Sequence, residues 1–412
     1  MSTFDLSVLF FLQVAAVLVV CRVVSAIATR LGQPPVVGEM IAGVLLGPSL
    51  FGLFWPEQQQ ALFPIASKPI LFSEAQIGLS LYMFTVGLDF RFELVRERLR
   101  SAASISVAGI LAPFGFGCAI AWVLLSRGGF FPANVTAIQA VPYMGAAMAI
   151  TAFPMLARII FERGLSGTTV GALALAAGAM DDAAAWAVLA LVLASFNHDP
   201  KIAVMAIGGG LLFVAVLFTA GRWLLKRVVA LSEKGEAAER AALGWMMVLL
   251  MVASWFTDYI RLYAVFGAFF LGAAVPRGAF VTKLQGLIEP VTTSLLLPLF
   301  FIYSGLNTRF DVVAGDPMLW VVTLAVLAAA IIGKAGACYA AARMCGEAHR
   351  EAMGVGALMN ARGLMELIIL NIGLERGVIT PTLFSILVFM AIVTTLMSTP
   401  MFNYIYRGAE AK

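Results

Sequence analysis

Apolar stretches long enough to cross a lipid bilayer recur along the whole chain, and they limit its fold more than any other feature. A membrane-spanning helix needs about 20 consecutive apolar residues. Of the 412 residues, 61% are hydrophobic and 12% are charged, whereas a soluble domain carries about 25% charged residues. The sequence therefore predicts an all-α polytopic membrane protein and no enzyme. Its net charge of +4 is not gathered on one segment, so no nucleic-acid partner is expected.

Thirteen spans are predicted, joined by short loops. They cover residues 6–29, 34–53, 70–90, 101–126, 135–160, 166–196, 202–225, 240–257, 260–276, 284–306, 318–342, 351–374 and 380–405. With the N-terminus outside, 19 of the 27 Lys and Arg residues lie on the cytoplasmic side and 6 lie outside. The remaining two, Lys334 and Arg362, fall within spans. Because basic loops stay in the cytoplasm, we expect an outside N-terminus and a cytoplasmic C-terminus.

Two adjacent acids, Asp181 and Asp182, lie within the apolar run 171–191 of the sixth span. A charge at the bilayer centre costs at least about 2.5–3.5 kcal/mol. Neighbouring carboxylates also repel, so at least one is expected to hold a proton near neutral pH. A proton and a cation would then compete for this site. Because hard cations prefer oxygen ligands, Thr151 and nearby backbone carbonyls are expected to join Asp181 and Asp182 around Na+ or K+.

Two pairs of similar segments indicate an inverted repeat. Residues 87–93 (GLDFRFE) resemble residues 305–311 (GLNTRFD), and residues 161–164 (FERG) resemble residues 374–377 (LERG). The matches end equivalent spans at nearly the same offset. Two six-helix halves joined by a linker helix would have opposite orientations, as in many secondary transporters. The alternative is that such short loop ends recur by chance.

Two spans are predicted to be broken near mid-membrane. Pro154 in the fifth removes a backbone hydrogen bond and clashes with the preceding turn, although a simple kink is the alternative there. The twelfth carries Asn360, Arg362 and Glu366 within seven residues. Irregular backbone at this depth is tolerated only where protein or a cavity surrounds it. We therefore expect two discontinuous, crossing helices whose dipole ends are offset by Arg362 and the aspartates.

Further roles follow for the charged residues of these spans. Asn360 is expected to hydrogen-bond unwound backbone. Arg362 and Glu366, at i,i+4 spacing, are expected to pair and stabilise the break; the alternative is that Glu366 takes part in proton passage. Lys334 lies midway through the eleventh span, where a lone ammonium is costly. We expect it to pair with Asp181, either as a static ion pair or as a proton carrier.

Three motifs together resemble the monovalent cation:proton antiporter-2 family, and their residues are most similar to those of its cation/H+ exchanger branch. They are residues 150–158 (ITAFPMLAR), 178–186 (GAMDDAAAW) and 359–367 (MNARGLMEL), and residues 36–48 are similar to the family's second span. The resemblance implies the sodium/proton antiporter fold with thirteen helices, a homodimer and an elevator-like movement. It also implies that Asp182 is the essential carboxylate, and that Lys334 is paired with Asp181 in electrogenic members.

The sequence thus predicts a secondary active antiporter that exchanges Na+ or K+ for H+ without a cofactor, in a bacterial inner membrane. Residues 99–197 and 318–406 are expected to form the core ion-translocation domain. Residues 1–98 and 237–312 are expected to form a scaffold and dimerisation domain, with 198–236 as a linker helix. Two alternatives stay open: a gated monovalent-cation channel that uses the same acids, and an organic-ion symporter on a related fold.

Overall fold

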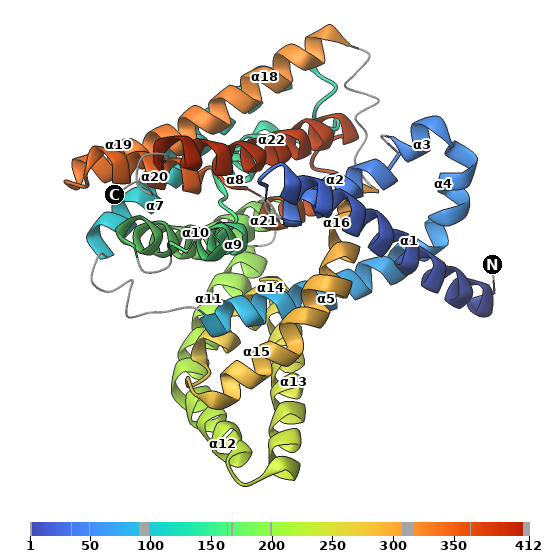
Figure 1. The fold of residues 1–412 in the computed structure, drawn as a ribbon. Helices are drawn as coiled ribbons and strands as arrows, with labels where there is room; N and C mark the ends of the chain where they lie inside the picture. The colour runs from blue at the N-terminus through green and yellow to red at the C-terminus, as the bar shows by residue number, and fades with distance from the viewer. Residues whose placement is uncertain are drawn as a thin grey trace. The chain divides into compact units, whose positions relative to one another are not determined.

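The computed structural model describes residues 2–33, 35–48, 50–89, 99–162, 164–165, 168–197, 200–306, 316–362 and 364–406. Within these ranges the regular secondary structure is entirely helical (Figure 1). The prediction of an all-α chain is confirmed. Three parts of the predicted repeat, residues 90–93, 163 and 307–311, lie outside the described ranges, as does Gly363. The inverted repeat therefore stays a prediction.

The helices follow one another along the chain with short connections. They are α1 (Thr3–Arg30), α2 (Pro35–Leu46), α3 (Phe51–Phe54), α4 (Pro56–Leu62), α5 (Lys68–Asp89), α7 (Leu99–Arg127), α8 (Ala137–Ala149), α9 (Phe153–Glu162), α10 (Thr169–Asn197), α11 (Pro200–Val216), α12 (Arg222–Ser232), α13 (Glu236–Tyr259), α14 (Ala264–Ala274), α15 (Ala279–Val291), α16 (Leu297–Gly305), α18 (Pro317–Ile331), α19 (Ala337–Met344), α20 (His349–Met359), α21 (Leu364–Glu375) and α22 (Pro381–Tyr406). A 3₁₀ turn, η1 (Ile65–Ser67), and three π-helical turns, η2 (Leu217–Gly221), η3 (Thr292–Leu296) and η4 (Ile332–Gly336), lie between them.

Proline and glycine mark several helix ends. α18 begins at Pro317, after Asp316 accepts a hydrogen bond from the Met318 N–H at 2.8 Å; proline suits this first position because its missing N–H has no helical acceptor there. Gly164 follows α9 and Gly377 follows α21, and both have a φ of +65°. This left-handed conformation, which favours glycine, ends a helix. The two glycines occupy equivalent positions in the predicted repeat.

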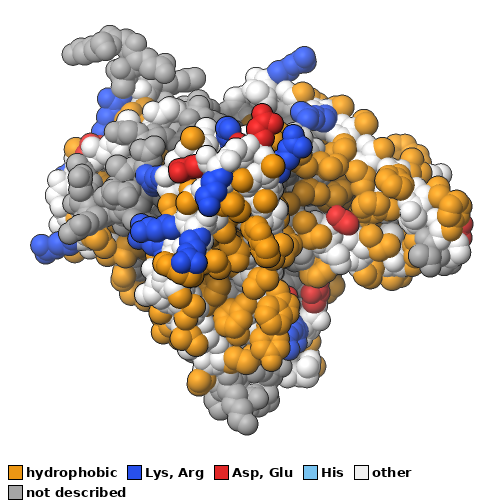
Figure 2. Space-filling model, turned by 90° about the horizontal axis from the view of Figure 1, so that it is seen from below, with side chains coloured by type: hydrophobic (Ala, Val, Ile, Leu, Met, Phe, Trp, Pro, Cys, Tyr) orange, Lys and Arg blue, Asp and Glu red, His pale blue; other side chains and the backbone are white. Residues whose placement is uncertain are grey.

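The exposed surface is apolar enough to require a bilayer. Among the described residues, nine helical stretches are long and apolar enough to cross a membrane, and Ala264–Ala274 is a shorter apolar helix. Large side chains such as Phe11, Trp122 and Trp255 are more than half exposed. Figure 2 shows hydrophobic side chains spread over much of one face. Contiguous apolar surface of this kind faces lipid or a partner, and together with the long apolar stretches it makes this a membrane protein. The number thirteen stays a prediction.

The chain divides into two compact units. The first comprises Met1–Leu18, Ile65–Arg91 and Leu193–Tyr303. In it, α14 packs against both α5 and α13 (Figure 1). α5 and α14 approach closely because each has a glycine at the contact: a Cβ at Gly87 would meet the Phe269 carbonyl, and one at Gly272 would meet the Phe84 carbonyl. Small residues allow this backbone contact without a hydrophobic driving force in lipid.

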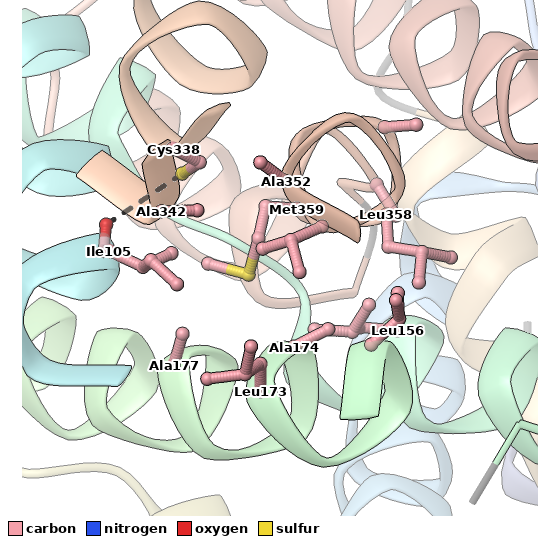
Figure 3. Packing of buried hydrophobic residues seen from close by; sticks show 14 of the residues in the cluster. Ile105, Leu156, Leu173, Ala174, Ala177, Cys338, Ala342, Ala352, Leu358 and Met359 are labelled. Atoms are coloured by element: carbon pink, nitrogen blue, oxygen red, sulfur yellow. Dashed lines mark hydrogen bonds between the residues drawn. The ribbon is translucent and has the colours of Figure 1, made fainter. Parts of the chain in front are cut away.

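The second unit comprises Val19–Pro64, Phe92–Val192 and Ser304–Lys412. Its apolar core is shared by α7, α9, α10, α19, α20 and α22, the last through Phe402. Figure 3 shows Ile105, Leu156, Leu173, Cys338 and Met359 converging there from five of these helices. The Cys338 thiol donates a weak hydrogen bond to the Ile105 carbonyl, with sulfur and oxygen 3.7 Å apart. This core packs six helices together around the interrupted segments described next.

Glycines beside the core pack rather than bind. A Cβ at Gly178 would lie 2.6 Å from Leu156 Cδ2, and one at Gly171 would meet the Leu165 carbonyl. α7 and α8 are similarly close, since a Cβ at Gly117 would lie 2.6 Å from the Met144 carbonyl oxygen. These contacts bring the backbones of neighbouring helices within reach of buried side chains.

Candidate functional site

Two helices of the second unit are interrupted, at the two places where the sequence predicted breaks. α8 ends at Ala149 and α9 begins at Phe153. α20 ends at Met359 and α21 begins at Leu364. The two breaks touch, because the Ala152 N–H donates to the Ala361 carbonyl at 3.3 Å. A backbone N–H at the first break and a backbone carbonyl at the second, which have no partner within their own helices, thus bond to each other.

The last carbonyls of α8 are bound by two cationic side chains. The Lys334 ammonium donates to the Ala149 carbonyl at 2.6 Å. The Arg362 guanidinium donates to the Met148 carbonyl at 2.7 Å and to the Ile150 carbonyl at 3.5 Å. Ile150, the residue after α8, has an extended backbone (φ −71°, ψ 137°), so its carbonyl has no helical donor of its own. A helix C-terminus carries partial negative charge, so two cations stabilise it.

The start of α9 is a helix N-terminus and carries partial positive charge, opposite in sign to the end of α8. The Phe153 N–H points to Asp182 Oδ1 at 3.5 Å, and a helix N-terminus favours an anion. The interrupted helix thus presents a negative end to Lys334 and Arg362 and a positive end to Asp182. The Pro154 side chain lies outside the described part of the structure, and its backbone lies in the first turn of α9, where proline is tolerated.

Both carboxylate oxygens of Asp181 accept hydrogen bonds from buried side chains. Its Oδ1 accepts from the Ser106 hydroxyl at 2.6 Å, and its Oδ2 accepts from the Thr151 hydroxyl and the Lys334 ammonium, both at 2.6 Å. The Asp181 and Lys334 side chains are completely buried. Removing one partner of such a pair leaves an uncompensated charge and costs about 3–5 kcal/mol. Thr151, expected as an ion ligand, is in this structure a donor to Asp181.

Asp182 is held far more loosely than its neighbour. It has an exposed fraction of 7%, against 1% for Asp181. The 3.5 Å contact with the Phe153 N–H is longer than a good hydrogen bond. Among the described residues Asp182 forms no ion pair. Of the two acids, Asp182 thus has fewer hydrogen-bond partners than Asp181 within the described ranges.

The Lys334 ammonium donates hydrogen bonds to three acceptors. Lys334 lies in the π-helical turn η4, a distortion that is frequent at functional sites. Its ammonium donates to the Gly109 carbonyl at 2.7 Å as well as to Ala149 and Asp181. An ammonium has three N–H donors, and each has an acceptor here. The predicted pairing of Lys334 with Asp181 is thus present, with two backbone carbonyls added.

The second break is built around Arg362. The side chains of Arg362 and Glu366 are fully buried and lie 3.5 Å apart, so the expected ion pair is present. Arg362 itself precedes α21, so the pair joins the break to the helix. The Thr395 hydroxyl of α22 lies 3.1 Å from the Arg362 amide nitrogen and 2.6 Å from its carbonyl oxygen. Thr395 therefore clamps the unwound backbone at this residue.

Several polar atoms near the second break have no hydrogen-bond partner within the described part of the chain. They include Asn360 Oδ1, Arg362 Nε and Glu366 Oε2. The Asn360 amide donates to the Thr394 carbonyl inside α22 at 3.4 Å, so the backbone that it contacts is helical rather than the unwound backbone that the sequence predicted. The interior at this break is consequently polar rather than apolar.

The expected site residues thus lie together in one unit, and further partners join them that the sequence did not single out. Ser106 is one, hidden in an apolar helix where a serine resembles any small packing residue. Thr395 is another; the buried polar positions 394, 395, 398 and 399 of α22 form a stripe that hints at it. Within the described ranges, no group of three or more His, Cys, Asp or Glu side chains gathers as a metal site.

Interrupted membrane helices that meet at buried charges are typical of one class of proteins, the secondary transporters. The comparisons narrow this class. The family model described as "Sodium/hydrogen exchanger, transmembrane" matches residues 14–405. The chain belongs to this sodium/hydrogen exchanger family, and the resemblance noted from its motifs is confirmed.

Named relatives agree with this assignment. The Na(+)/H(+) antiporter NhaS4 of Synechocystis is 36% identical over 400 residues, which cover 97% of both chains. Cation/H(+) antiporter 19 of Arabidopsis thaliana is 35% identical and K(+)/H(+) antiporter 1 of Saccharomyces cerevisiae is 30% identical. The alignments cover 98% and 97% of this chain but only 50% and 46% of those proteins, so the chain spans about half the length of the plant and yeast relatives.

A solved structure shows the same fold. The sodium proton antiporter MjNhaP1 from Methanocaldococcus jannaschii superposes with a TM-score of 0.67, covering 97% of this chain and 98% of that one. Its sequence identity is 15%. At this identity the likeness concerns the fold alone, and it agrees with the expected sodium/proton antiporter architecture.

Proposed function

We propose that the chain is a secondary active antiporter that exchanges a monovalent cation for H+ across a membrane, with Asp182 as the carboxylate that binds them in turn. The observation that carries this proposal is the contrast between the adjacent acids. Within the described part of the chain, Asp181 accepts three hydrogen bonds of 2.6 Å, whereas Asp182 has one contact, of 3.5 Å with a backbone N–H. Asp181 supports the site, and Asp182 exchanges its ligand.

Competition for one carboxylate is sufficient for antiport. A protonated carboxyl has no charge with which to hold a cation, and a bound cation repels the proton. Proton and cation therefore exclude each other, and exchange follows when the site opens to one side at a time and returns only when loaded. The cyanobacterial relative is named for Na+ and the yeast relative for K+. Both ions are accordingly the substrates to test.

The proposed movement is elevator-like, with 99–197 and 318–406 as the moving core. Residues 1–98 and 237–312 are the proposed scaffold and dimerisation domain of a homodimer, and 198–236 is the proposed linker. The supporting observation is that the acids, Lys334 and both breaks all belong to one compact unit, so they would travel together. We further propose a bacterial inner membrane, with the N-terminus outside.

The proposed test is direct. Purified protein is reconstituted in liposomes with a pH-sensitive dye inside and an imposed pH gradient, and Na+, K+ or Li+ is added in turn. Wild type should collapse the gradient with at least one of these cations. Asp182→Asn should abolish the response while the protein stays folded, because an amide neither binds a proton reversibly nor carries a charge.

Asp258→Asn is the matched control. This exposed acid lies at the end of α13 in the first unit, whereas both breaks belong to the second unit, and its amide should exchange like wild type. Full exchange in Asp182→Asn would refute the role of this carboxylate. Current that flows without a counter-ion would favour the channel, and no response to any cation by folded wild type would favour the organic-ion symporter.

The role of Lys334 is separable from that of Asp182. If the Lys334 ammonium gives up its proton as the cation binds, two protons exchange for one cation and transport is electrogenic. We expect Lys334→Gln to exchange electroneutrally, with a rate that no longer responds to an imposed membrane potential. Unchanged voltage dependence in that variant would leave Lys334 only its structural part in the buried pair.

A further inference from the structure

The helix α12 of the first unit carries basic side chains close together on an exposed side. Arg222 and Lys226 are spaced i,i+4, and so are Trp223 and Arg227, so the four side chains adjoin on the helix surface. All four are exposed. α12 contains no acidic residue. These four side chains are called the α12 patch below.

Packing holds the α12 patch on the outer side of the helix. Leu225 and Val228 are only 1% and 8% exposed, and α12 packs against α13 (Figure 1). Burial of these two apolar residues leaves the basic side of α12 outward. The Arg227 guanidinium lies 3.8 Å from the centroid of the Trp223 ring, a cation–π contact that keeps the two side chains together at the surface.

The positive charge of the α12 patch has no counter-charge within the described part of the chain. None of its three basic side chains forms an ion pair there. Glu239, on the neighbouring α13, is paired with Lys283 at 3.0 Å. Like charges at i,i+4, such as Arg222 and Lys226, repel each other. A negatively charged group from outside the chain would relieve this repulsion.

The length of the preceding helix sets the level of the α12 patch in the membrane. Lys201 and Arg222 bracket residues 202–221, which contain no charged side chain. At 1.5 Å per residue this run is about 30 Å long, which equals the thickness of the hydrocarbon layer. Arg222 thus begins where the hydrocarbon ends, and the patch lies in the layer of lipid headgroups. Tryptophan is enriched at that level, in agreement with the exposed Trp223.

We propose that the α12 patch binds the headgroup of an anionic phospholipid in the adjoining leaflet. Arg222, Lys226 and Arg227 supply donors and positive charge for the phosphate, and guanidinium groups suit phosphate oxygens especially well. A zwitterionic phospholipid also has a phosphate, but its own ammonium cancels the charge, so the anionic lipid is preferred. The occupant is a lipid rather than a soluble phosphate because the helix places the patch where lipid phosphates are concentrated.

Quenching of Trp223 fluorescence tests this site directly. Purified protein is reconstituted in vesicles of phosphatidylcholine and phosphatidylglycerol, and either lipid carries bromine atoms that quench nearby tryptophan. The signal of Trp223 is the difference between each protein and the same protein with Trp223→Phe. We expect brominated phosphatidylglycerol, the anionic lipid, to quench this signal at a lower mole fraction than brominated phosphatidylcholine.

Arg222→Gln/Lys226→Gln should remove this preference while the contact between Arg227 and Trp223 stays in place. One basic residue at an anionic membrane surface contributes about fivefold to binding, so the preference for phosphatidylglycerol should fall at least about fivefold. Arg222→Lys/Lys226→Arg retains both charges and should retain the preference. Thermal unfolding in detergent verifies that each variant is folded.

Lys234→Gln/Arg240→Gln is the matched control, because it removes the same charge from exposed residues just beyond α12. Its preference should match that of wild type. An unchanged preference in Arg222→Gln/Lys226→Gln would overturn the proposal. An equal loss in the two Gln double variants would also overturn it, since the charge of the whole region would then attract lipid without a defined site.

Inorganic phosphate distinguishes the two sources of the same anion. Compared with chloride at equal ionic strength, it should leave the quenching by phosphatidylglycerol unchanged. Reversal of the quenching would assign the α12 patch to soluble phosphate and overturn the lipid site. The measurement requires no ion exchange, so its outcome is separate from that of Asp182→Asn.

Discussion

Two acids next to each other in the sequence have unlike surroundings because successive residues of a helix point about 100° apart. Asp181 faces Ser106 and Lys334, whereas Asp182 faces the start of α9. The sequence revealed the pair and its lysine, since charges are rare among apolar residues. It did not reveal which acid is saturated, because that depends on hydroxyls and carbonyls of helices distant in the chain.

Thr395 offers a residue-scale prediction about stability. Its hydroxyl contacts both backbone polar atoms of Arg362, at 3.1 Å and 2.6 Å. Thr395→Val keeps the shape of the side chain but leaves the Arg362 N–H buried without that acceptor. An unsatisfied buried group costs about 1–3 kcal/mol. We expect a correspondingly lower midpoint of thermal unfolding in detergent, and weaker exchange because Arg362 also binds the end of α8.

Thr399 on the same helix provides the control. It is 1% exposed, and its hydroxyl has no hydrogen-bond partner within the described residues. Replacing an unsatisfied hydroxyl by a methyl of the same shape is neutral or stabilising. Thr399→Val should therefore unfold at or above the wild-type temperature. Equal destabilisation of the two variants would show that valine is poorly accommodated in α22. The stabilising role of the Thr395 hydroxyl at the Arg362 backbone would then lose its support.

Among elements, the two interrupted helices were predictable and the π-helical turns were not. Pro154 and the polar run from Asn360 to Glu366 conflict with a continuous membrane helix, and the structure interrupts both spans there. A π-helical turn inserts one residue without requiring any particular side chain. η4 therefore left no signal in the sequence, although it carries Lys334.

The contact between α5 and α14 supports a prediction at this scale. A Cβ at Gly87 would meet the backbone carbonyl of Phe269, which has little freedom to move. Gly87→Ala should therefore force the two helices apart, at a cost of about 1–3 kcal/mol for overpacking. We expect a lower unfolding midpoint in detergent.

Gly244→Ala in α13 is the comparison, because a Cβ there meets nothing within 4 Å. In that open position alanine stabilises the helix by about 0.5–1 kcal/mol relative to glycine, so the midpoint should rise or stay unchanged. If Gly87→Ala were as stable as Gly244→Ala, the close contact between α5 and α14 would not contribute to the fold.

At the scale of the whole molecule, hydropathy predicted a membrane protein but not which helices face lipid. α1 and α22 are both apolar by sequence, yet α1 is mostly exposed and α22 is mostly buried. The difference arises because α22 covers the second break, through Thr394 and Thr395, whereas much of α1 presents side chains such as Phe4 and Phe11 outward. Burial of this kind depends on partners, and a single apolar stretch does not encode them.

The orientation in the membrane is a property of the whole chain, and the distribution of basic residues predicts it. Glu233, in the turn between α12 and α13, should be cytoplasmic, and Gln58, on α4, should be outside. Both are exposed. In a variant whose natural cysteines, Cys21, Cys118, Cys338 and Cys345, are replaced by alanine, a membrane-impermeant maleimide applied to intact cells should label Gln58→Cys and spare Glu233→Cys until the cells are opened.

The reverse labelling would require an inside N-terminus. That outcome would place the excess of Lys and Arg outside, against the rule that basic loops stay in the cytoplasm. It would leave the exchange proposed at Asp182 intact, because the competition of a proton and a cation for one carboxylate has no preferred side. Orientation decides instead which face of the membrane receives the cation, and therefore the direction in which a given proton gradient drives it.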